Sequence, residues 1–200
     1  MKIILASQSS RRRDILENLG VQFEIKVSSV DESMDPALSA GENTSAVSLR
    51  KAEAVEKELG VCPEDDALII ASDTVVVCDG VILGKPKDKA HATSMMRMLS
   101  GRRHSVISGI AVIYRGKRVS AYEETEVEFR TLTDSEIEAY VSTDEPYDKA
   151  GGYGIQDKAA VFVRGIHGDY LNVVGLPVYR LCRILKKEFG IGFFGGFTVS

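Results

Sequence analysis

The sequence predicts an α/β fold in which a mixed sheet with sizeable antiparallel pairing is flanked by helices. Short apolar runs, which are typical of buried strands, alternate along the chain with segments that repeat apolar residues at helical spacing. The dipeptides Asp79-Gly80 and Arg115-Gly116 each separate two apolar runs, and such two-residue turns favour hairpins. The 200 residues, 44% of them hydrophobic and 27% charged, suit one globular domain over residues 1–200, or two closely merged lobes.

Local signals justify the individual elements. Gly20 and Gly60 follow the last apolar positions of two helical segments, where glycine commonly ends a helix. Thr133 and Glu136 form a capping box that starts a short helix, and Pro177 suits the first position of the last helix. We expect strands at residues 3–6, 21–30, 67–71, 75–78, 81–83, 106–114, 118–132, 159–163 and 170–174. We expect helices at residues 11–19, 44–59, 88–99, 133–141 and 177–189, and loops at residues 31–43 and 146–156. One helix presents an apolar face that we expect to be plain core, made of Ala92, Met95, Met96 and Leu99.

Charge and cysteine content narrow the function classes. Lys and Arg number 25 against 29 Asp and Glu, so no general coating of nucleic acid is expected. A local basic pocket for a small anion remains compatible with this balance. The three cysteines are far apart and form no CxxC pair, which favours a reducing, cytoplasmic location. The polar residues that soon follow the first apolar run argue against a signal peptide, and no apolar stretch is long enough to predict a membrane span.

Three arginines crowd the start of the first helix, after a serine-rich segment that includes Ser7. The positive end of a helix dipole favours acids by about 0.3–1 kcal/mol each, so Arg11, Arg12 and Arg13 are out of place there. A bound anion, held by backbone N–H groups and guanidinium groups, would resolve the conflict. The alternative is a solvated basic face. In either case we expect at least one arginine to point to solvent or to an acidic partner.

Asp73 is a carboxylate flanked on both sides by sequence typical of buried strands. A buried carboxylate needs a metal, a cation or hydrogen-bond donors. At a strand end facing a cleft, it suits metal binding or general-base chemistry. The alternative is a turn aspartate at a kink between two strands.

Lys51 stands where an apolar residue belongs, because Val47 and Val55 flank it at four-residue spacing on one helix. It either extends its ammonium past the edge of the core or reaches a cleft that holds an anion. Lys85 follows the predicted hairpin and is a weaker candidate of the same kind.

Two further segments are weaker candidates. Gly151-Gly-Tyr-Gly154-Ile-Gln156 is a segment in which backbone can approach a ligand, although turn geometry also explains its glycines. Asp31 and Glu32 lie in an acidic loop and are candidate second metal ligands, or solvated loop acids. The whole set of arginines, lysines and one embedded carboxylate fits phosphate chemistry with a divalent cation. The sequence contains no GxxxxGK[ST] loop, so a P-loop enzyme is not expected.

Eight ordered segments match one known family. They are Leu5-Ala-Ser-Gln-Ser-Ser-Arg-Arg12, Val30-Asp-Glu-Ser33, Arg50-Lys-Ala52, Ala71-Ser-Asp-Thr74, Gly84-Lys-Pro86, Leu99-Ser-Gly101, Glu145-Pro-Tyr-Asp-Lys-Ala-Gly-Gly-Tyr-Gly-Ile-Gln156 and Asn172-Val-Val-Gly-Leu-Pro177. Over nearly its whole length, the chain resembles the Maf family of nucleoside triphosphate pyrophosphatases. Ser10 departs from the pattern, because the family usually has Pro before its arginines. Serine is also a common helix-start residue, so we expect little consequence.

The resemblance implies an elongated α/β fold with a central cleft, similar to that of inosine triphosphate pyrophosphatases. It implies hydrolysis of a nucleoside triphosphate to the monophosphate and pyrophosphate, and it makes a homodimer the expected partner state. In the dTTP/UTP type of the family, specificity is associated with an Arg, a Thr and a Gln, which match Arg11, Thr74 and Gln156. The 7-methyl-GTP type carries Trp, Gln and Glu there, so the chain resembles the dTTP/UTP type.

We therefore expect a pyrophosphatase that hydrolyses dTTP and UTP, acts more weakly on CTP, and requires Mg²⁺ or Mn²⁺. Modified pyrimidine triphosphates are further candidate substrates. The expected roles are general base for Asp73, metal ligand for Asp73 and Glu32, and phosphate binding for Ser7, Arg12, Lys51 and Lys85. One alternative is a non-catalytic nucleotide-binding regulator of cell division. The other is a pyrophosphatase for 7-methyl-GTP or other purine triphosphates.

Overall fold

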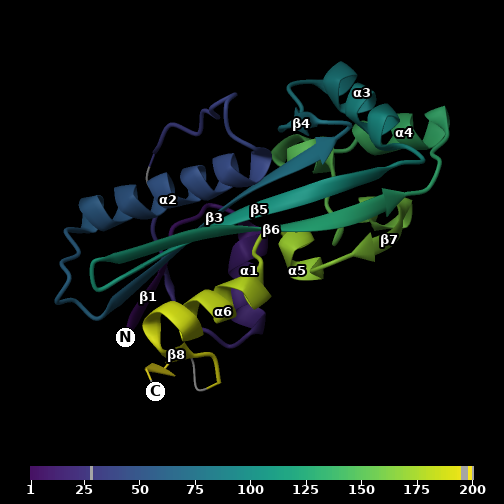
Figure 1. Cartoon of the computed structure of the whole chain (residues 1–200). Helices are drawn as coiled ribbons and strands as arrows, with labels where there is room; N and C mark the ends of the chain where they lie inside the picture. Colours follow the sequence, from purple (N-terminus) through teal and green to yellow (C-terminus); the bar gives the residue numbers. More distant parts are fainter. Residues whose placement is uncertain (28, 195–197, 200) are drawn as a thin grey trace. The chain divides into compact units, whose positions relative to one another are not determined.

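Seven strands form one mixed sheet in the computed structural model, which describes residues 1–27, 29–194 and 198–199 (Figure 1). The strands are β1 (Lys2–Leu5), β2 (Glu24–Ile25), β3 (Ala67–Cys78), β4 (Val81–Leu83), β5 (Arg103–Tyr114), β6 (Lys117–Phe129) and β7 (Val163–His167). Their order is β2-β1-β3-β5-β6-β7, and β4 also pairs with β3. β1 is parallel to β2 and β3, whereas β4 and β7 are antiparallel to their partners. The predicted α/β class with a mixed sheet is confirmed.

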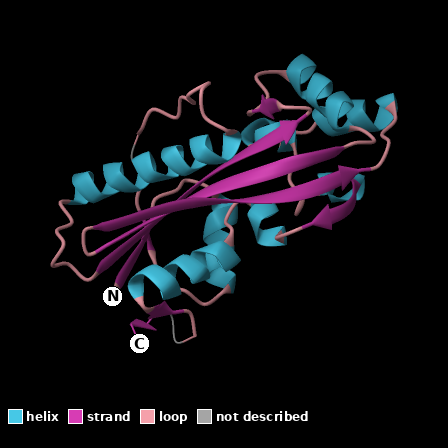
Figure 2. Ribbon diagram, viewed as in Figure 1, coloured by secondary structure: helices cyan, strands magenta, loops and turns pink. Residues whose placement is uncertain are grey.

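Helices connect most of the strands, as Figure 2 shows. The α-helices are α1 (Ser10–Asn18), α2 (Ala40–Leu59), α3 (Lys89–Leu99), α4 (Asp134–Val141), α5 (Tyr170–Val174) and α6 (Val178–Phe189). Three short 3₁₀ segments are η1 (Glu145–Asp148), η2 (Ala150–Gly152) and η3 (Lys158–Phe162), and a small separate sheet pairs β8 (Ile191–Gly192) with β9 (Thr198–Val199). Among the described helices, none is both long and apolar enough to cross a bilayer.

The contacts between residues divide the chain into two compact units. Unit 1 comprises Met1–Asp73, Ser108–Glu123 and Gly175–Ser200, and unit 2 comprises Thr74–Ile107 and Glu124–Val174. The strands β3, β5 and β6 each supply residues to both units. Neither unit is therefore one continuous segment of sequence.

In unit 1, α2 covers one face of the strands, and Figure 1 shows α1 and α6 on the other side. The side chains that pack beneath α2 come from every second residue of β1, β3 and β5, and from Ala6 just after β1. This spacing arises because successive residues of a strand point to opposite faces. They are Ile4, Ala6, Ala67, Ile69, Ala71, Ala111 and Ile113, and they contact Ala52 and Val55 of α2. At Gly109 the two backbones meet directly, since a Cβ there would lie 2.2 Å from the backbone of Thr44. This close packing seats α2 on the strands of unit 1.

Unit 2 has its own core around α3 and the aromatic ring of Phe129. The predicted apolar face of α3 is confirmed, because Ala92, Met95, Met96 and Leu99 are all buried in this core. Phe129 makes edge contacts with His104, Tyr153 and Phe162. The segments that carry two predicted site residues, Lys85 and Gln156, pack against this core through Leu83 and Tyr153.

Three boundaries in the first half differ from the prediction. Residues 67–71 and 75–78 belong to one strand, β3, because a salt bridge with Lys51 allows Asp73 to stay inside it. Helix α2 begins at Ala40, four residues early, because Ser39 accepts a hydrogen bond from the Glu42 N–H in a capping box. Of the strand expected over residues 21–30, β2 is the part that forms among residues 21–27 and 29–30, and residue 28 lies outside the described residues.

Two strands expected in the second half are helical. Residues 158–162 form η3, which starts where the Glu145 carboxylate accepts hydrogen bonds from the N–H groups of Lys158 and Ala159. Residues 170–174 form α5, where Asp169 Oδ1 accepts a hydrogen bond from Leu171 N–H. Side-chain acceptors at the start of a turn favour helical backbone over an extended strand. The expected loop at residues 146–156 contains η1 and η2, and β7 lies between the two expected strands.

The buried His104 predicts a pH dependence of stability. Burial lowers the pKa of His104 to about 4, and its Nε2 lies 2.7 Å from the Tyr153 hydroxyl. The unfolded chain has an ordinary histidine pKa of about 6.5, so it binds more protons than the native state between these two values. The free energy of unfolding is therefore expected to fall as pH falls from 6.5 towards 4. Relative to neutral pH, this loss reaches about 2–3 kcal/mol at pH 4.5.

Urea unfolding at pH 7 and pH 4.5 tests this, with His104→Gln as the comparison. The variant lacks the titrating ring, whereas the carboxylates titrate in both proteins. The wild type should therefore lose more stability on acidification. An equal loss in the two proteins would contradict the assignment.

Candidate active site

The predicted catalytic residue Asp73 lies within β3, on the face that α2 covers. It shares this face with Ala67, Ile69 and Ala71, which stand at even spacings before it. Lys51 extends from α2 towards the same face, because it falls in the helical stripe with the buried Val47 and Val55. Strand alternation and helix periodicity therefore direct Asp73 and Lys51 at each other.

Lys51 joins the two predicted acids of unit 1. Its Nζ lies 2.7 Å from Asp73 Oδ1 and 2.9 Å from Glu32 Oε1. The side chains of Lys51 and Asp73 are 16% and 14% exposed, whereas that of Glu32 is 61% exposed. Lys51 therefore does not extend past the core to solvent, and it neutralises carboxylates of its own chain.

Of the two loop acids, Glu32 is the one that contacts Lys51. The Asp31 carboxylate accepts hydrogen bonds from the N–H and the hydroxyl of Ser33, which lower the pKa of Asp31. Arg50 on α2 donates a hydrogen bond of 2.7 Å to the Ser33 carbonyl oxygen. The acidic loop is thus tied to α2 next to Lys51, which places Glu32 beside the lysine.

Arg12 is the second cation of the site in unit 1. Its Nε donates a 2.7 Å hydrogen bond to the Gly175 carbonyl oxygen, and its Nη1 donates to Ser7 Oγ at 3.1 Å. Burial lowers the pKa of Arg12 to about 10, while the charges of Asp73 and Glu32 raise it and Arg11 lowers it further. Arg12 is therefore a cation at neutral pH, close enough to these residues to interact electrostatically.

The start of α1 carries the three arginines in its first turn, where a bound anion remains a prediction. Ser9 is the residue before the helix, and the first turn carries no acid. Ser7 is buried, and its Oγ accepts a hydrogen bond from Ser9 N–H. Arg13 turns away to Asp14 and Glu17, at 3.2 and 3.7 Å, which confirms that one arginine has an acidic partner.

Sequence reasoning missed the groups that anchor Arg12. Ser72 Oγ lies 2.7 Å from the Gly109 carbonyl oxygen and 2.9 Å from that of Gly175. The Gly175 carbonyl oxygen therefore accepts hydrogen bonds from both Arg12 and Ser72. The Ser72 side chain lies on the face of β3 opposite to Asp73, because neighbouring residues of a strand point to opposite faces. The only signals were the family segment that contains Gly175, and strand alternation, which puts Ser72 on the face away from Asp73.

Unit 2 carries the candidates Lys85, Thr74 and Gln156. Lys85 is exposed after β4, and Gln156 is exposed after η2. The two segments are joined because Gly151 N–H donates a 3.0 Å hydrogen bond to the Gly84 carbonyl oxygen. Thr74 is half-buried and directly follows Asp73 in the chain, whereas Arg11 belongs to unit 1.

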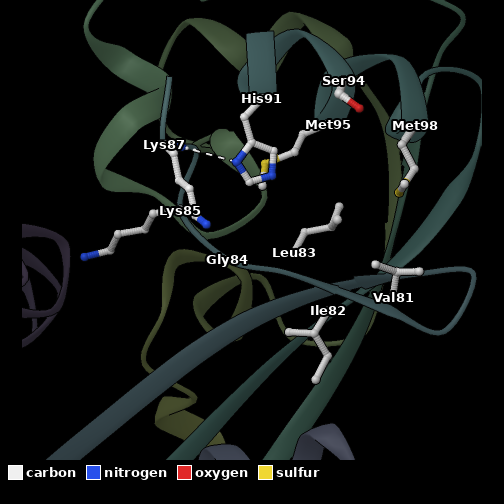
Figure 3. A pocket seen from close by; sticks show the side chains of 10 residues that line it. All are labelled: Val81, Ile82, Leu83, Gly84, Lys85, Lys87, His91, Ser94, Met95 and Met98. Carbon is white, nitrogen blue, oxygen red and sulfur yellow. Dashed lines mark hydrogen bonds between the residues drawn. The ribbon is translucent and has the colours of Figure 1, made fainter. Parts of the chain in front are cut away.

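A hollow of about 340 Å³ lies between β4 and α3 in unit 2 (Figure 3). Leu83, Met95 and Met98 line its apolar part, and His91 Nδ1 accepts a hydrogen bond from Lys87 N–H. Lys85 is at its rim, with its ammonium directed away from the apolar side chains in Figure 3.

The donor set of unit 1 fits a divalent cation that is shared with a substrate. Among the described residues, no group of three or more His, Cys, Asp or Glu side chains could hold a metal ion by itself. Mg²⁺ is commonly bound by one or two carboxylates together with water and substrate phosphates. Asp73 and Glu32, which both contact Lys51, supply two such carboxylates, and the nearby cations Arg11, Arg12 and Lys51 suit a polyanion.

Comparisons with known proteins identify the family of the chain. The sequence model of the family described as Maf-like protein matches residues 2–188. A protein named dTTP/UTP pyrophosphatase from Bacillus anthracis is 48% identical over 93% of this chain and 95% of its own length. A protein of the same name from Bacillus cytotoxicus is 47% identical with the same coverage. A solved dITP/XTP pyrophosphatase from Mycobacterium abscessus is 16% identical, with a TM-score of 0.41 over 66% of this chain and 76% of that one.

Proposed function

Because the chain belongs to the Maf-like protein family, we propose that it is a nucleoside triphosphate pyrophosphatase that hydrolyses dTTP and UTP. The products are the nucleoside monophosphate and pyrophosphate. The names of the Bacillus relatives support the activity and the substrates. The observation that carries the chemistry is the Asp73–Lys51–Glu32 cluster, with Arg12 close enough to interact electrostatically with both acids, because it combines a base with cations for a polyanion.

In the proposed reaction, water attacks the α-phosphorus of the substrate. A bond forms between the water oxygen and the α-phosphorus, and the bond from that phosphorus to the α,β-bridging oxygen breaks. Asp73 accepts the proton of the attacking water, and the electron pair of the broken bond leaves with pyrophosphate. Asp73 is suited to this because it is fixed within a strand and held by the Lys51 ammonium, which lies 2.7 Å from its Oδ1.

The cations stabilise the charge that moves onto pyrophosphate. Arg12 is held in place by Gly175 and Ser7, so its guanidinium is oriented before substrate binds. Lys51 is proposed to bind phosphate, and Lys85 is proposed as a phosphate ligand from unit 2 on the family resemblance. Ser7 is proposed to contribute its hydroxyl to the phosphate site at the start of α1.

Asp73 and Glu32 are the residues that would hold Mg²⁺ or Mn²⁺, which, when bound, would polarise phosphate oxygens and offset their charge. The free state of Cys62, Cys78 and Cys182 supports a reducing, cytoplasmic location. The homodimer implied by the family resemblance stays a prediction.

Base selection is proposed for Arg11, Thr74 and Gln156. The amide of Gln156 offers one donor and one acceptor, which match the O4 and N3–H groups of uracil and thymine. We expect UTP and dTTP to be preferred, CTP to be weaker because N4–H₂ replaces O4, and GTP, ATP and 7-methyl-GTP to be poor substrates. A site that hydrogen-bonds its ligand can discriminate strongly, because a mismatch leaves buried polar groups unpaired.

The test is a panel of these triphosphates with and without Mg²⁺ or Mn²⁺, in water enriched in ¹⁸O. The expected products are pyrophosphate and a monophosphate that contains the label, since attack occurs at the α-phosphorus. Gln156→Glu should depress UTP hydrolysis, because it removes the amide donor that O4 needs. The absence of pyrophosphate would refute the activity. Equal kcat/KM for UTP and 7-methyl-GTP would refute only the base assignment.

A further inference from the structure

Lys149 lies between η1 and η2 in unit 2 and is buried, with 8% exposure. Its Nζ donates hydrogen bonds to the Glu145 carbonyl oxygen at 2.8 Å and to Asp148 Oδ1 at 2.7 Å. Asp157 Oδ2 lies 3.5 Å from the same nitrogen. A buried ammonium is costly unless oxygens neutralise it, so this lysine ties Glu145 and Asp148 to Asp157.

The turn that carries Gln156 is packed against this lysine. Asp157 N–H donates a 3.2 Å hydrogen bond to the Gly154 carbonyl oxygen, which closes the turn around Gln156. A Cβ on Gly154 would lie 2.4 Å from Asp157 Oδ2 and 2.8 Å from Lys149 Cε. Both side chains therefore occupy the space over Gly154, and the Lys149–Asp157 pair spans the turn.

A second contact fixes the far side of the same turn. Glu145 Oε2 accepts a hydrogen bond from Lys158 N–H at 3.1 Å, and Glu145 Oε1 accepts one from Ala159 N–H at 3.2 Å. The Glu145 carbonyl oxygen is itself bound by Lys149. The two residues that follow Gln156 are thus anchored, one by a side-chain ion pair and the other through its backbone N–H.

We propose that Lys149 is a positioning residue that orients Gln156, and that it thereby sets the preference for uracil and thymine over cytosine. This rests on the proposed function, because it assigns base reading to Gln156. Gln156 is exposed, so packing of its own side chain does not fix it, and the anchored residues that follow it fix the backbone from which its amide extends. Selective hydrogen bonding requires such a fixed group, since a misplacement of about 1 Å can cost about a hundredfold in rate.

The test compares kcat/KM for UTP and CTP in the wild type and in Lys149→Met. Methionine keeps an unbranched side chain of similar length and removes the charge. The UTP-to-CTP ratio is expected to fall about tenfold, mainly through a higher KM for UTP. Asp157→Asn keeps the shape of its side chain and weakens one partner, so it should lower the ratio in the same direction if Lys149→Met fails to fold. Lys89→Met is the matched control, because it removes an exposed lysine of the same unit that pairs with Glu138.

A second comparison separates positioning from plain stability. In a Gln156→Ala background, Lys149→Met should cause no further change in the UTP-to-CTP ratio, since the group it orients is gone. Hydrogen exchange of a peptide covering residues 145–159 should be faster in Lys149→Met than in the wild type. A purely structural lysine would instead lower kcat for both substrates in proportion and leave the ratio unchanged.

The outcomes are distinguishable. A wild type that releases no pyrophosphate refutes the proposed function. A wild type that releases pyrophosphate but does not prefer UTP to CTP refutes base reading, and this inference with it. A selective wild type whose ratio survives Lys149→Met and Asp157→Asn, even with faster exchange, overturns the role of Lys149 alone.

Discussion

Replacing Asp73 by Asn is expected to reduce kcat for UTP hydrolysis about a hundredfold or more. Asparagine has nearly the same shape, and its oxygen can still accept a hydrogen bond from Lys51, but it cannot take a proton from water. The fold should therefore survive, with a melting temperature close to that of the wild type. Pyrophosphate release at saturating UTP measures the loss, and thermal unfolding checks the fold.

Asp66→Asn is a suitable control for this variant. Asp66 immediately precedes β3 and accepts a 2.7 Å hydrogen bond from the Tyr114 hydroxyl, and its other oxygen lies 2.9 Å from the N-terminal ammonium. Its replacement removes a carboxylate from unit 1 without altering the Lys51 cluster, so kcat should not change. Near wild-type turnover in Asp73→Asn would overturn the assignment of the general base.

Lys51→Met is expected to reduce kcat/KM by about a hundredfold or more, because it removes a cation from the phosphate site. It should also lower the free energy of unfolding, by roughly 1–3 kcal/mol. The reason is that Asp73 is only 14% exposed and loses the ammonium that lies 2.7 Å away. Steady-state kinetics and urea unfolding give the two effects separately.

The double variant Lys51→Met with Asp73→Asn separates the catalytic from the structural part. Removing the carboxylate as well leaves no unpaired charge in β3, so stability should recover relative to Lys51→Met while activity remains lost. Reduced stability of Lys51→Met combined with intact kinetics would show that the ammonium only balances charge within the fold.

The parts of the fold that could be predicted are those in which a few neighbouring residues decide the backbone. The hairpin at Asp79-Gly80 is an example, since both residues have positive φ, at 49° and 77°, as such a tight turn requires. The capping box of Thr133 and Glu136 is another. The strand predicted at residues 170–174 was wrong, because a short segment with apolar residues on both sides of Asn172 suits either a strand or a helix. Besides the local hydrogen bond from Leu171 N–H to Asp169, long-range contacts hold this helix, since Asn172 Nδ2 donates hydrogen bonds to Val106 O and Thr125 Oγ1.

The candidate site likewise has residues that the sequence could single out and contacts that it could not predict. Asp73 and Lys51 could be singled out because each breaks the apolar pattern of its own segment. That they bind each other could not be predicted, because it depends on which face of β3 receives α2. The role of the Gly175 carbonyl in orienting Arg12 could not be predicted either, because a backbone acceptor leaves no trace in the choice of side chains and the family segment that contains Gly175 does not show what it binds.

The alternation of the chain between its two units also limits how the protein can be re-engineered by exchanging gene segments. The chain passes between the units four times, after Asp73, Ile107, Glu123 and Val174, and three of these passages fall inside strands. No single exchange of a gene segment can therefore replace unit 2, which holds Thr74 and Gln156, without cutting through the sheet. A change of base preference must therefore proceed by changes within the units and not by exchange of a whole unit, and protease cleavage in exposed loops cannot release either unit as an intact fragment.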